Sequence, residues 1–308
     1  MSLFGMLWPK GASGFGYGSS AEDVTAGLSL QGKTFLVTGC NSGIGLETVR
    51  VLGLRGAHVI CLARTAQKAA EATAGLQGQF TPIACELSEP ASVRAAVADV
   101  RALGLKLDGI LANAGIMALA NLTLQHGYEA QFFTNHVGHF ILVTGLLDLL
   151  ADDGRVVLTS STGHTMAPKG GVDFNNLDGS QGYVSWVAYG QSKIANLLFA
   201  KELARRFAGT QKAAFAVHPG VIATNLTRNM GMLTAPADVL MAISSPLVLK
   251  SVGEGAATQL WAATQPGLAS ISGSYLASCN VAKPRKDTED PAIAAKLWAK
   301  TEEIVAAL

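Results

Sequence analysis

Two residues four positions apart, Tyr189 and Lys193, lie in the stretch 186–203, which reads as an amphipathic helix. This spacing places the phenol and the ammonium on one helix face, a single turn apart. A phenol with a pKa of about 10 is a poor proton shuttle near neutral pH, and a fixed positive charge beside it lowers that pKa. The pair is therefore a candidate site of proton transfer. The alternative is that Tyr189 packs in the interior while Lys193 extends its amine into water.

A glycine-rich turn, TGCNSGIG, follows the strand-like stretch 33–39. Gly39, Gly43 and Gly45 let the backbone turn sharply and approach a phosphate, and the helix that follows offers free amides at its positive end. The spacing G-x-x-x-G-x-G is related to the G-x-G-x-x-G fingerprint but distinct from it. Between the first strand and helix of a βαβ unit the turn predicts a dinucleotide site, although such a turn can also be only a tight connection.

The end of the second strand-like stretch, 57–63, indicates which dinucleotide would bind. A carboxylate at this place would hydrogen-bond the ribose 2′-hydroxyl of NAD, but the sequence has Ala63 and then Arg64, 19 positions after Gly45. A guanidinium offers a bidentate fork to a 2′-phosphate, so the sequence predicts NADP(H) rather than NAD(H). Lys68 could assist one turn later. The alternative is that Arg64 is an ordinary exposed residue at a strand end.

Short apolar stretches alternate with helical patterns along the chain, including a long helical stretch to about Leu150. Strands that are continuously apolar and lie between helices predict a parallel sheet covered on both faces. The predicted strands lie in 33–39, 57–63, 80–87, 108–115, 154–161, 213–220 and 273–278.

The organisation that follows is a single α/β domain, residues 31–308, without internal repeats or a break in composition. We expect a doubly wound, Rossmann-like fold with a mostly parallel sheet of about seven strands. Residues 1–30 include a Gly/Ser-rich stretch and are predicted to form a flexible N-terminal arm, resting on the domain body or on a partner subunit.

Composition excludes several classes of protein. Of the 308 residues 49% are hydrophobic and 15% are charged, which indicates a globular protein with a large core rather than a disordered chain. The net charge of +1 gives no electrostatic footprint for nucleic acid. There is neither an apolar run of about 18 residues, as a membrane span requires, nor a positively charged start typical of a secretory signal.

Cysteine and histidine residues give no metal signature. The four cysteines are far apart and form no C-x-x-C pair, so a reduced, cytoplasmic protein is expected rather than a disulfide framework or zinc site. His136 and His139 have the i, i+3 spacing of a possible metal pair, but no third ligand is close in sequence, and a structural role is favoured. The cysteines are Cys40, Cys61, Cys85 and Cys279.

Over about residues 31–282 the chain resembles the short-chain dehydrogenase/reductase family. The narrower likeness is to the branch of the retinol dehydrogenases and the WW-domain oxidoreductase catalytic domain, through NSGIGLET, NHVGHF, FNNL, YGQSKIANLLFAKEL and HPGVIATNL. The family motifs are Thr38-Gly39-x-x-x-Gly43-Ile44-Gly45, Ala112-Asn113-Ala114-Gly115, TNHVGHF around Asn135, TSSTG at 159–163, Tyr189-x-x-x-Lys193 and PGVIAT at 219–224.

The resemblance implies that Asn135, Ser161, Tyr189 and Lys193 are the catalytic residues. Tyr189 would give a proton to a ketone oxygen, and remove it in the reverse direction, while the nicotinamide exchanges a hydride. Lys193 would lower the tyrosine pKa and hold the nicotinamide ribose, Ser161 would hydrogen-bond the substrate oxygen, and Asn135 would hold a water that links Lys193 to solvent. Ser160 is the alternative to Ser161, and ordinary turn chemistry remains possible for both.

The resemblance also implies the cofactor contacts, and the chain departs from the family pattern at three of its positions. Ala112 replaces the first of two asparagines, Glu86 stands where Asp is usual, and Ser42 stands where some NADP-preferring members have a basic residue, which leaves Arg64 as the main phosphate anchor. The implied contacts are Gly39, Asn41, Ser42, Gly43, Ile44, Gly45, Arg64, Glu86, Leu87, Asn113, Ala114, Gly115, Tyr189, Lys193, Pro219, Gly220, Ile222 and Thr224.

In this family the segment at about 225–250 forms a substrate lid. It has one cation, Arg228, before Lys250, and its apolar residues are adaptable, so we expect a lipophilic secondary alcohol and its ketone, or a retinol-like alcohol and its aldehyde. Helix packing is the alternative role for these residues, which are Met230, Met232, Leu233, Leu240 and Met241.

Taken together, the residues and the resemblance predict an NADP-dependent alcohol dehydrogenase or carbonyl reductase, with no metal. The resemblance implies a homodimer or homotetramer, because the helices that bear Asn135 and Tyr189 commonly form subunit contacts in the family. The alternative function is a catalytically silent NADP(H)-binding regulatory or scaffold protein.

Overall fold

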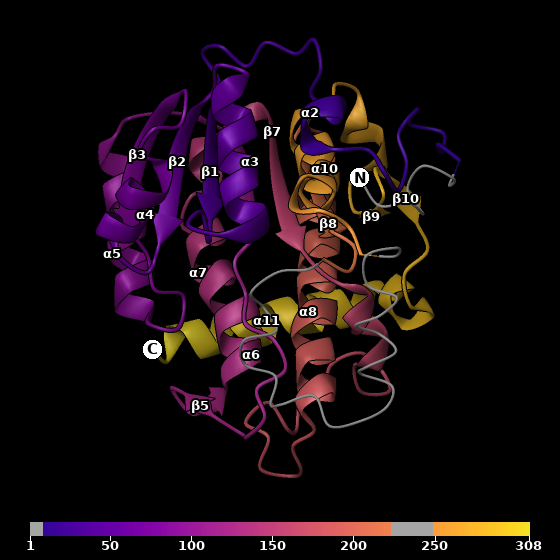
Figure 1. The fold of residues 1–308 in the computed structure, drawn as a ribbon. Helices are drawn as coiled ribbons and strands as arrows, with labels where there is room; N and C mark the ends of the chain where they lie inside the picture. The colour runs from indigo at the N-terminus through magenta and orange to yellow at the C-terminus, as the bar shows by residue number, and fades with distance from the viewer. Residues whose placement is uncertain (1–8, 223–248) are drawn as a thin grey trace.

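The structure is a computed structural model that describes residues 9–222 and 249–308. Thr224, Arg228 and the apolar residues of the predicted lid lie outside the described residues, so their assigned roles stay predictions. The described chain forms a central sheet with helices on both sides (Figure 1).

The central sheet has eight strands among the described residues, in the order β10-β9-β8-β7-β4-β1-β2-β3. Every neighbouring pair is parallel except β9 and β10, which confirms the predicted doubly wound, mostly parallel fold. The eighth strand, β10, was not predicted, because none of its three residues is fully buried and it lacks the apolar pattern of the other strands. The strands are β1 Thr34–Thr38, β2 His58–Ala63, β3 Gln79–Ala84, β4 Leu107–Ala112, β7 Leu150–Thr159, β8 Ala213–His218, β9 Tyr275–Ala277 and β10 Asn280–Ala282.

The sheet separates two hydrophobic cores, as expected when both faces are covered. All five residues of β1 are buried, and successive side chains alternate between the faces. Leu36 belongs to the core under α5, α7, α8 and α11, whereas Phe35 and Val37 belong to the core under α2, α3, α4 and α10. A strand buried on both sides has to be apolar throughout, and for this reason these strands could be predicted from the sequence.

The helices include one long helix, α8, and a π-helical segment, η1, that interrupts the stretch predicted as one long helix. The α-helices are α2 Ala21–Val24, α3 Gly43–Leu54, α4 Ala66–Thr73, α5 Pro90–Ala102, α6 Ala130–Phe132, α7 Gly138–Thr144, α8 Ser185–Arg206, α10 Val252–Thr264 and α11 Pro291–Ala306. The short elements are η1 Phe133–Val137, η2 Leu147–Leu149, η3 Thr162–Met166, η5 Leu268–Ile271, η6 Lys286–Glu289 and the hairpin β5 Leu124–Gln125 with β6 Tyr128–Glu129.

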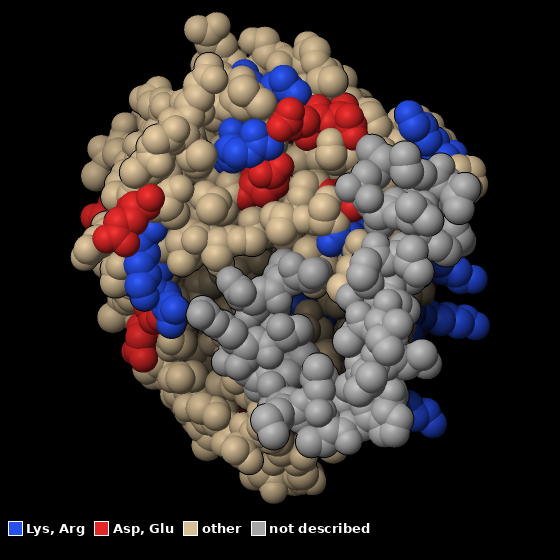
Figure 2. Space-filling model, viewed as in Figure 1, with Lys and Arg blue, Asp and Glu red and all other residues tan. Residues whose placement is uncertain are grey.

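The strand order reverses between β1 and β4, because β1 leads outward to β2 and β3 while β4 leads to β7, β8 and β9. In open α/β sheets ligands bind outside the carboxyl ends of the strands at such a reversal. Figure 2 shows the surface hollowed near the middle of this face, where the carboxyl ends of the strands lie in Figure 1. The fold therefore directs attention to the residues that follow β1, β4 and β7.

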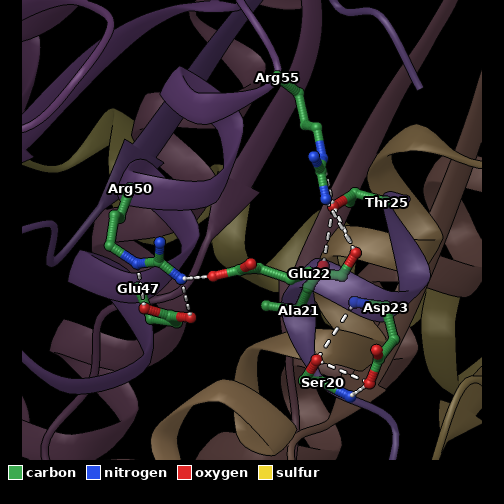
Figure 3. A network of polar contacts seen from close by, with 8 residues as sticks. All are labelled: Ser20, Ala21, Glu22, Asp23, Thr25, Glu47, Arg50 and Arg55. Carbon is green, nitrogen blue, oxygen red and sulfur yellow. Dashed lines mark hydrogen bonds and ion pairs between the residues drawn. The ribbon is translucent and has the colours of Figure 1, made fainter. Parts of the chain in front are cut away.

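The described part of the predicted arm, residues 9–30, lies on the domain body. Its helix α2 begins with a capping box between Ser20 and Asp23, and its Ala21 and Val24 side chains are buried. Figure 3 shows how α3 holds it: Arg50 pairs with Glu22 at 2.6 Å. The arm thus forms part of the core around α3 and α10.

Two further features bear on the sequence expectations. None of the helices formed by residues 9–222 and 249–308 combines the length and the apolar character that a membrane crossing requires. The four cysteines are all buried free thiols.

Candidate active site

The turn after β1 has a backbone that only glycine permits at two places. Gly39 has a φ of +68°, in the left-handed region. A Cβ at Gly45 would collide with the carbonyl oxygen of Gly39 and lie 2.7 Å from Asn113 Nδ2. The turn is thus folded tightly on itself, which leaves its outer backbone accessible.

The ends of β1 and β4 are joined by hydrogen bonds to Thr38. Asn113 Nδ2 donates to the Thr38 carbonyl oxygen at 3.0 Å, and the Ala114 amide donates to Thr38 Oγ1 at 3.0 Å. Asn113, predicted as a cofactor contact, is therefore also a support of the glycine turn.

The first turn of α3 fits a dinucleotide pyrophosphate. Its N-cap residue Ser42 makes no capping hydrogen bond with a described residue, and Asn41 and Ser42 are both exposed. Uncapped amides at a helix N-terminus favour an anion. Arg64 is exposed directly after β2, and Lys68 is exposed on α4, so both cations are free to reach a ligand beside the turn.

Two other predicted cofactor residues have protein contacts of their own. The Glu86 carboxylate accepts hydrogen bonds from the amide and hydroxyl of Ser88, at 3.3 and 3.0 Å. Leu87 is buried, and its carbonyl oxygen lies against Gly138 of α7, where a Cβ would collide with it. These contacts turn the chain from β3 into α5 at the edge of the predicted cofactor site.

The two serines after β7 have different neighbours. Ser160 is buried and its Oγ donates to the Lys193 carbonyl oxygen at 2.8 Å. The Ser161 side chain lies close enough to Tyr189 to act on the pKa of the phenol, which it lowers, and its Oγ accepts from the Gly163 amide at 3.0 Å. Ser161 is therefore the serine placed to share a substrate oxygen with Tyr189.

Tyr189 and Lys193 lie on α8 as predicted, and both side chains are buried. Tyr189 is 8% exposed and Lys193 is 3% exposed, so Lys193 does not extend into water. Its Nζ lies 5.6 Å from the centroid of the Tyr189 ring and donates to the Thr159 carbonyl oxygen at 3.2 Å.

The pKa directions at this pair differ from the sequence argument. Burial raises the pKa of Tyr189, and the neighbouring Ser161 side chain lowers it only in part. Burial also lowers the pKa of Lys193, to about 8. The expected depression of the tyrosine pKa by Lys193 is absent here because desolvation opposes the charged form of each group. The phenol is thus held in its protonated form.

Asn135 lies within the π-helical segment η1 and is fully buried. Its side chain closes the loop after β4: Oδ1 accepts from the Ile116 amide at 2.8 Å, and Nδ2 donates to the Ile116 carbonyl oxygen at 2.9 Å and to Ser192 Oγ at 2.9 Å. A Cβ at Gly115 would lie 3.0 Å from Asn135 Oδ1 and 3.2 Å from Lys193 Nζ. Asn135, Gly115 and Lys193 therefore meet at one point, with no room for a larger residue.

His139 was not among the predicted site residues, yet it joins two of the site's elements. Its Nδ1 lies 2.9 Å from the Asn135 carbonyl oxygen and its Nε2 lies 2.9 Å from Thr38 Oγ1. Because the Asn135 carbonyl oxygen can only accept, Nδ1 donates to it, and Nε2 of the neutral ring accepts from the Thr38 hydroxyl. The water-holding role of Asn135 stays a prediction. The i, i+4 spacing from Asn135 was the available sequence signal.

The histidine pair predicted to be structural is buried in the core. His136 Nε2 lies 3.0 Å from Thr301 Oγ1, and burial lowers the pKa values of His136 and His139 to about 3 and about 4. Within the described ranges no group of three histidine, cysteine, aspartate or glutamate residues is placed to hold a metal ion.

The Pro219-Gly220 turn follows β8 at the same edge of the sheet. Gly220 has a φ of +95°, and a Cβ there would lie 2.6 Å from Lys250 Cδ. Ile222 forms a β-bridge with Lys250.

Comparison with known proteins gives concordant results. The sequence matches the family model described as short chain dehydrogenase over residues 33–232. It is 39% identical to the chloroplastic short-chain dehydrogenase TIC 32 A of Brassica napus, covering 100% of both chains. It is 36% identical to mouse retinol dehydrogenase 12, over 89% of this chain and 86% of that protein.

Solved structures show the same similarity. A crystal structure of a Mycobacterium paratuberculosis protein covers 94% of this chain and 98% of its own, with 32% identity and a TM-score of 0.75. A short chain dehydrogenase from Burkholderia cenocepacia in complex with NADP covers 80% of this chain and 96% of its own, with 27% identity and a TM-score of 0.63.

Proposed function

This chain belongs to the short chain dehydrogenase family, and we propose that it is an NADP(H)-dependent oxidoreductase that interconverts a lipophilic secondary alcohol and its ketone, or a retinol-like alcohol and its aldehyde. The observation that supports this most directly is the convergence of Ser161, Tyr189 and Lys193 beside the glycine turn. The Tyr189 phenol lies there beside Ser161, with the buried Lys193 ammonium 5.6 Å from its ring centroid.

The cofactor would be held by the carboxyl edge of the sheet. The turn from Gly39 to Gly45 and the first amides of α3 suit the pyrophosphate, and Arg64 suits a 2′-phosphate. Lys193, whose Nζ would lie 3.2 Å from a Cβ at Gly115, would hold the nicotinamide ribose. When bound, the nicotinamide supplies or accepts the hydride. The NADP complex of the Burkholderia cenocepacia relative supports the choice of NADP(H).

The residues of the chain would handle the proton and the developing charge. Ser161 Oγ and Tyr189 Oη both hydrogen-bond the carbonyl oxygen, and Tyr189 gives its proton to that oxygen as the hydride arrives at carbon. Burial raises the pKa of Tyr189, so the phenol is ready to donate at neutral pH. The Lys193 ammonium then offsets the charge on the phenolate.

Exposed apolar side chains around Tyr189 support a lipophilic substrate. Trp186, one turn earlier on α8, is 39% exposed, with its ring edge-on to Tyr189 at 5.9 Å. Val184 and Met166 are 61% and 40% exposed on the neighbouring segments. Apolar surface of this kind near a reacting group favours an apolar ligand, and the names of the retinol dehydrogenase relatives agree with it.

The test is Tyr189→Phe, which removes the proton donor and little else. We expect NADPH oxidation with bulky aromatic ketones, steroids or retinal to fall about 10²–10⁴-fold, while NADPH binding, measured by nucleotide fluorescence, stays within about twofold of the wild-type value. Unchanged turnover in the variant contradicts the mechanism. A wild-type protein that binds NADPH but turns over none of these compounds is the catalytically silent regulatory or scaffold protein.

Assembly and location are also proposals. We expect a homodimer or homotetramer, to be checked by light scattering. The cytoplasmic location expected from the sequence needs a direct measurement, because the Brassica napus relative is chloroplastic.

A further inference from the structure

Two buried polar atoms near Tyr189 have no part in the proposed reaction. Tyr275 Oη and His218 Nδ1 have no hydrogen-bond partner among the described residues, and Tyr275 is only 4% exposed. Buried polar atoms nearly always have a partner. A phenylalanine would pack at position 275 equally well and would leave no hydroxyl unpaired, so the hydroxyl needs an explanation.

Tyr275 is the first residue of β9 and His218 is the last residue of β8, and both lie on the face of the sheet that α8 covers. In the parallel pair β8 and β9, Ala216 is opposite Tyr275 and His218 is opposite Ala277. Ala216 and Tyr275 both belong to the core under α8. Because side chains two positions apart on a strand share a face, His218 lies on this face as well, one step nearer the strand end.

His164 connects Tyr275 to the proposed catalytic residues. The rings of His164 and Tyr275 meet edge-on with centroids 5.0 Å apart. His164 Nε2 accepts from the Arg285 amide at 3.1 Å, and Nδ1 donates to the carbonyl oxygen of Ser161 at 2.5 Å. Both nitrogens of His164 are therefore used, and Tyr275 packs directly against the residue that fixes the Ser161 backbone.

Four other buried side-chain atoms in the described ranges share the lack of a partner, but their surroundings differ. His136 and Trp298 are packed around Phe199 in the core between α8 and α11. Thr159 and Asn196 lie beside Lys193, because the Thr159 carbonyl accepts from both Lys193 and Asn196. Tyr275 and His218 differ from these in lying on β9 and β8, beyond Ser161 as seen from the glycine turn.

We propose that Tyr275 and His218 form a polar subsite for a second, neutral oxygen of the substrate, a hydroxyl or carbonyl group remote from the carbon that is reduced. The proposal rests on the proposed function, since it deepens the account of that substrate. A lipophilic molecule that carries one further oxygen would pair the two atoms and would be oriented by them against Ser161 and Tyr189.

The charge state of the subsite favours a neutral group over a carboxylate. Burial lowers the pKa of His218 to about 4 and raises that of Tyr275, so both are uncharged at neutral pH. The ammonium of Lys250 also lowers the pKa of His218. Its Nζ lies 4.5 Å from the Tyr17 ring centroid and donates to Ser278 Oγ at 3.4 Å.

The experiment compares pairs of ketones in wild-type protein and in Tyr275→Phe. Each pair is a lipophilic ketone and the same ketone with one added hydroxyl or keto group, placed at several separations from the reacting carbonyl. We expect the wild type to favour the oxygenated member of at least one pair about tenfold or more in kcat/KM. We expect Tyr275→Phe to reduce that preference about tenfold and to leave the parent ketone unaffected. Tyr128→Phe, in β6, is the matched control and should change neither value.

Two results would overturn the proposal. One is a preference that is the same in wild type and Tyr275→Phe for every pair. The other is an equal loss for both members of each pair, which would show that the hydroxyl only supports the fold. Failure of the proposed function is distinguishable from both, because the wild type would then reduce no ketone at all. Thermal unfolding of Tyr275→Phe should match that of the wild type, since the hydroxyl has no protein partner to lose.

Discussion

Tyr189 and Lys193 show how burial changes a pair whose charges would otherwise help each other. Each is within a tenth of full burial, and the Lys193 ammonium is hydrogen-bonded to a backbone carbonyl rather than to the phenol. Desolvation therefore dominates both groups, and it leaves Tyr189 as a proton donor. From the sequence alone, Lys193 was expected to favour the phenolate form of Tyr189. The spacing of the two residues indicates that they are close, but it does not show that both groups lose water on burial.

Arg64 is the residue on which the choice of cofactor depends. We predict that Arg64→Ala weakens NADPH binding about 10–100-fold, because a charge-assisted contact with the 2′-phosphate is lost. NADH, which lacks that phosphate, should bind as before. Fluorescence titration with both nucleotides measures the ratio. Arg101→Ala is the control, since Arg101 is paired with Asp148 away from the turn. If Arg64→Ala weakened the binding of NADPH and NADH equally, Arg64 would not be the contact of the 2′-phosphate.

Gly45 tests whether the tight turn is the cofactor cradle. An alanine there would place its Cβ against the Gly39 carbonyl, so Gly45→Ala should weaken NADPH binding by more than about 100-fold or prevent folding. Gly253→Ala in α10 is the matched control, because the nearest atom to its Cβ is Glu47 Oε1 at 3.6 Å. The control should be neutral or more stable by about 0.5–1 kcal/mol. A Gly45→Ala protein that binds NADPH normally would contradict the assignment.

At the scale of elements, two segments have a structure that depends on neighbours distant in the sequence. The π-helical segment η1 carries Asn135 and lies where hydrogen bonds from the loop after β4 and from α8 meet. Such π-helical turns are frequent at functional sites. The arm helix α2 has four residues, too few to be stable alone, and it depends on its contacts with α3 and α10.

The attachment of the arm should rest on its buried methyl groups more than on its ion pair. Val24 is fully buried, so Val24→Ala should reduce the free energy of unfolding by about 1–3 kcal/mol. Glu22→Gln breaks an exposed pair with Arg50 and should cost less than about 1 kcal/mol. Urea titration of both variants gives the comparison. A larger loss for Glu22→Gln would mean that charge, not burial, holds the arm.

At the scale of the whole molecule, the two cores bury several histidines in neutral form. Burial lowers the pKa values of His136, His139 and His218 from 6.5 to about 3, about 4 and about 4. In the unfolded chain these groups regain their ordinary pKa. Below pH 6.5 the unfolded state therefore binds more protons than the folded state, and stability falls as the pH falls. Glu129, whose pKa burial raises, opposes part of this effect.

We predict that the free energy of unfolding decreases between pH 6.5 and about 4.5 with a slope of about 3–4 kcal/mol per pH unit, equivalent to the uptake of two to three protons. His136→Met should reduce the number of protons taken up on unfolding by about one, and the slope should decrease in proportion. Urea unfolding at several pH values measures the slope. A flat profile over this range would show that the histidines are not held neutral.

The sequence by itself determined the sheet, the glycine turn and the identity of the residues around Tyr189. Strands such as β1 could be predicted because both of their faces are buried, and the turn could be predicted because its backbone requires glycine at Gly39. Both constraints are local: burial on both faces requires apolar residues along a strand, and the conformation of the turn requires glycine.

Only the tertiary structure decided which serine meets Tyr189, that Lys193 is buried, and that His139 contacts Thr38, 101 positions away. It also decided that the arm lies on the body and that Tyr275 Oη is unpaired beside the site. The physical reason is the same in each case. Burial and hydrogen bonding depend on groups that other strands and helices bring near, and residue spacing along one element does not specify those groups.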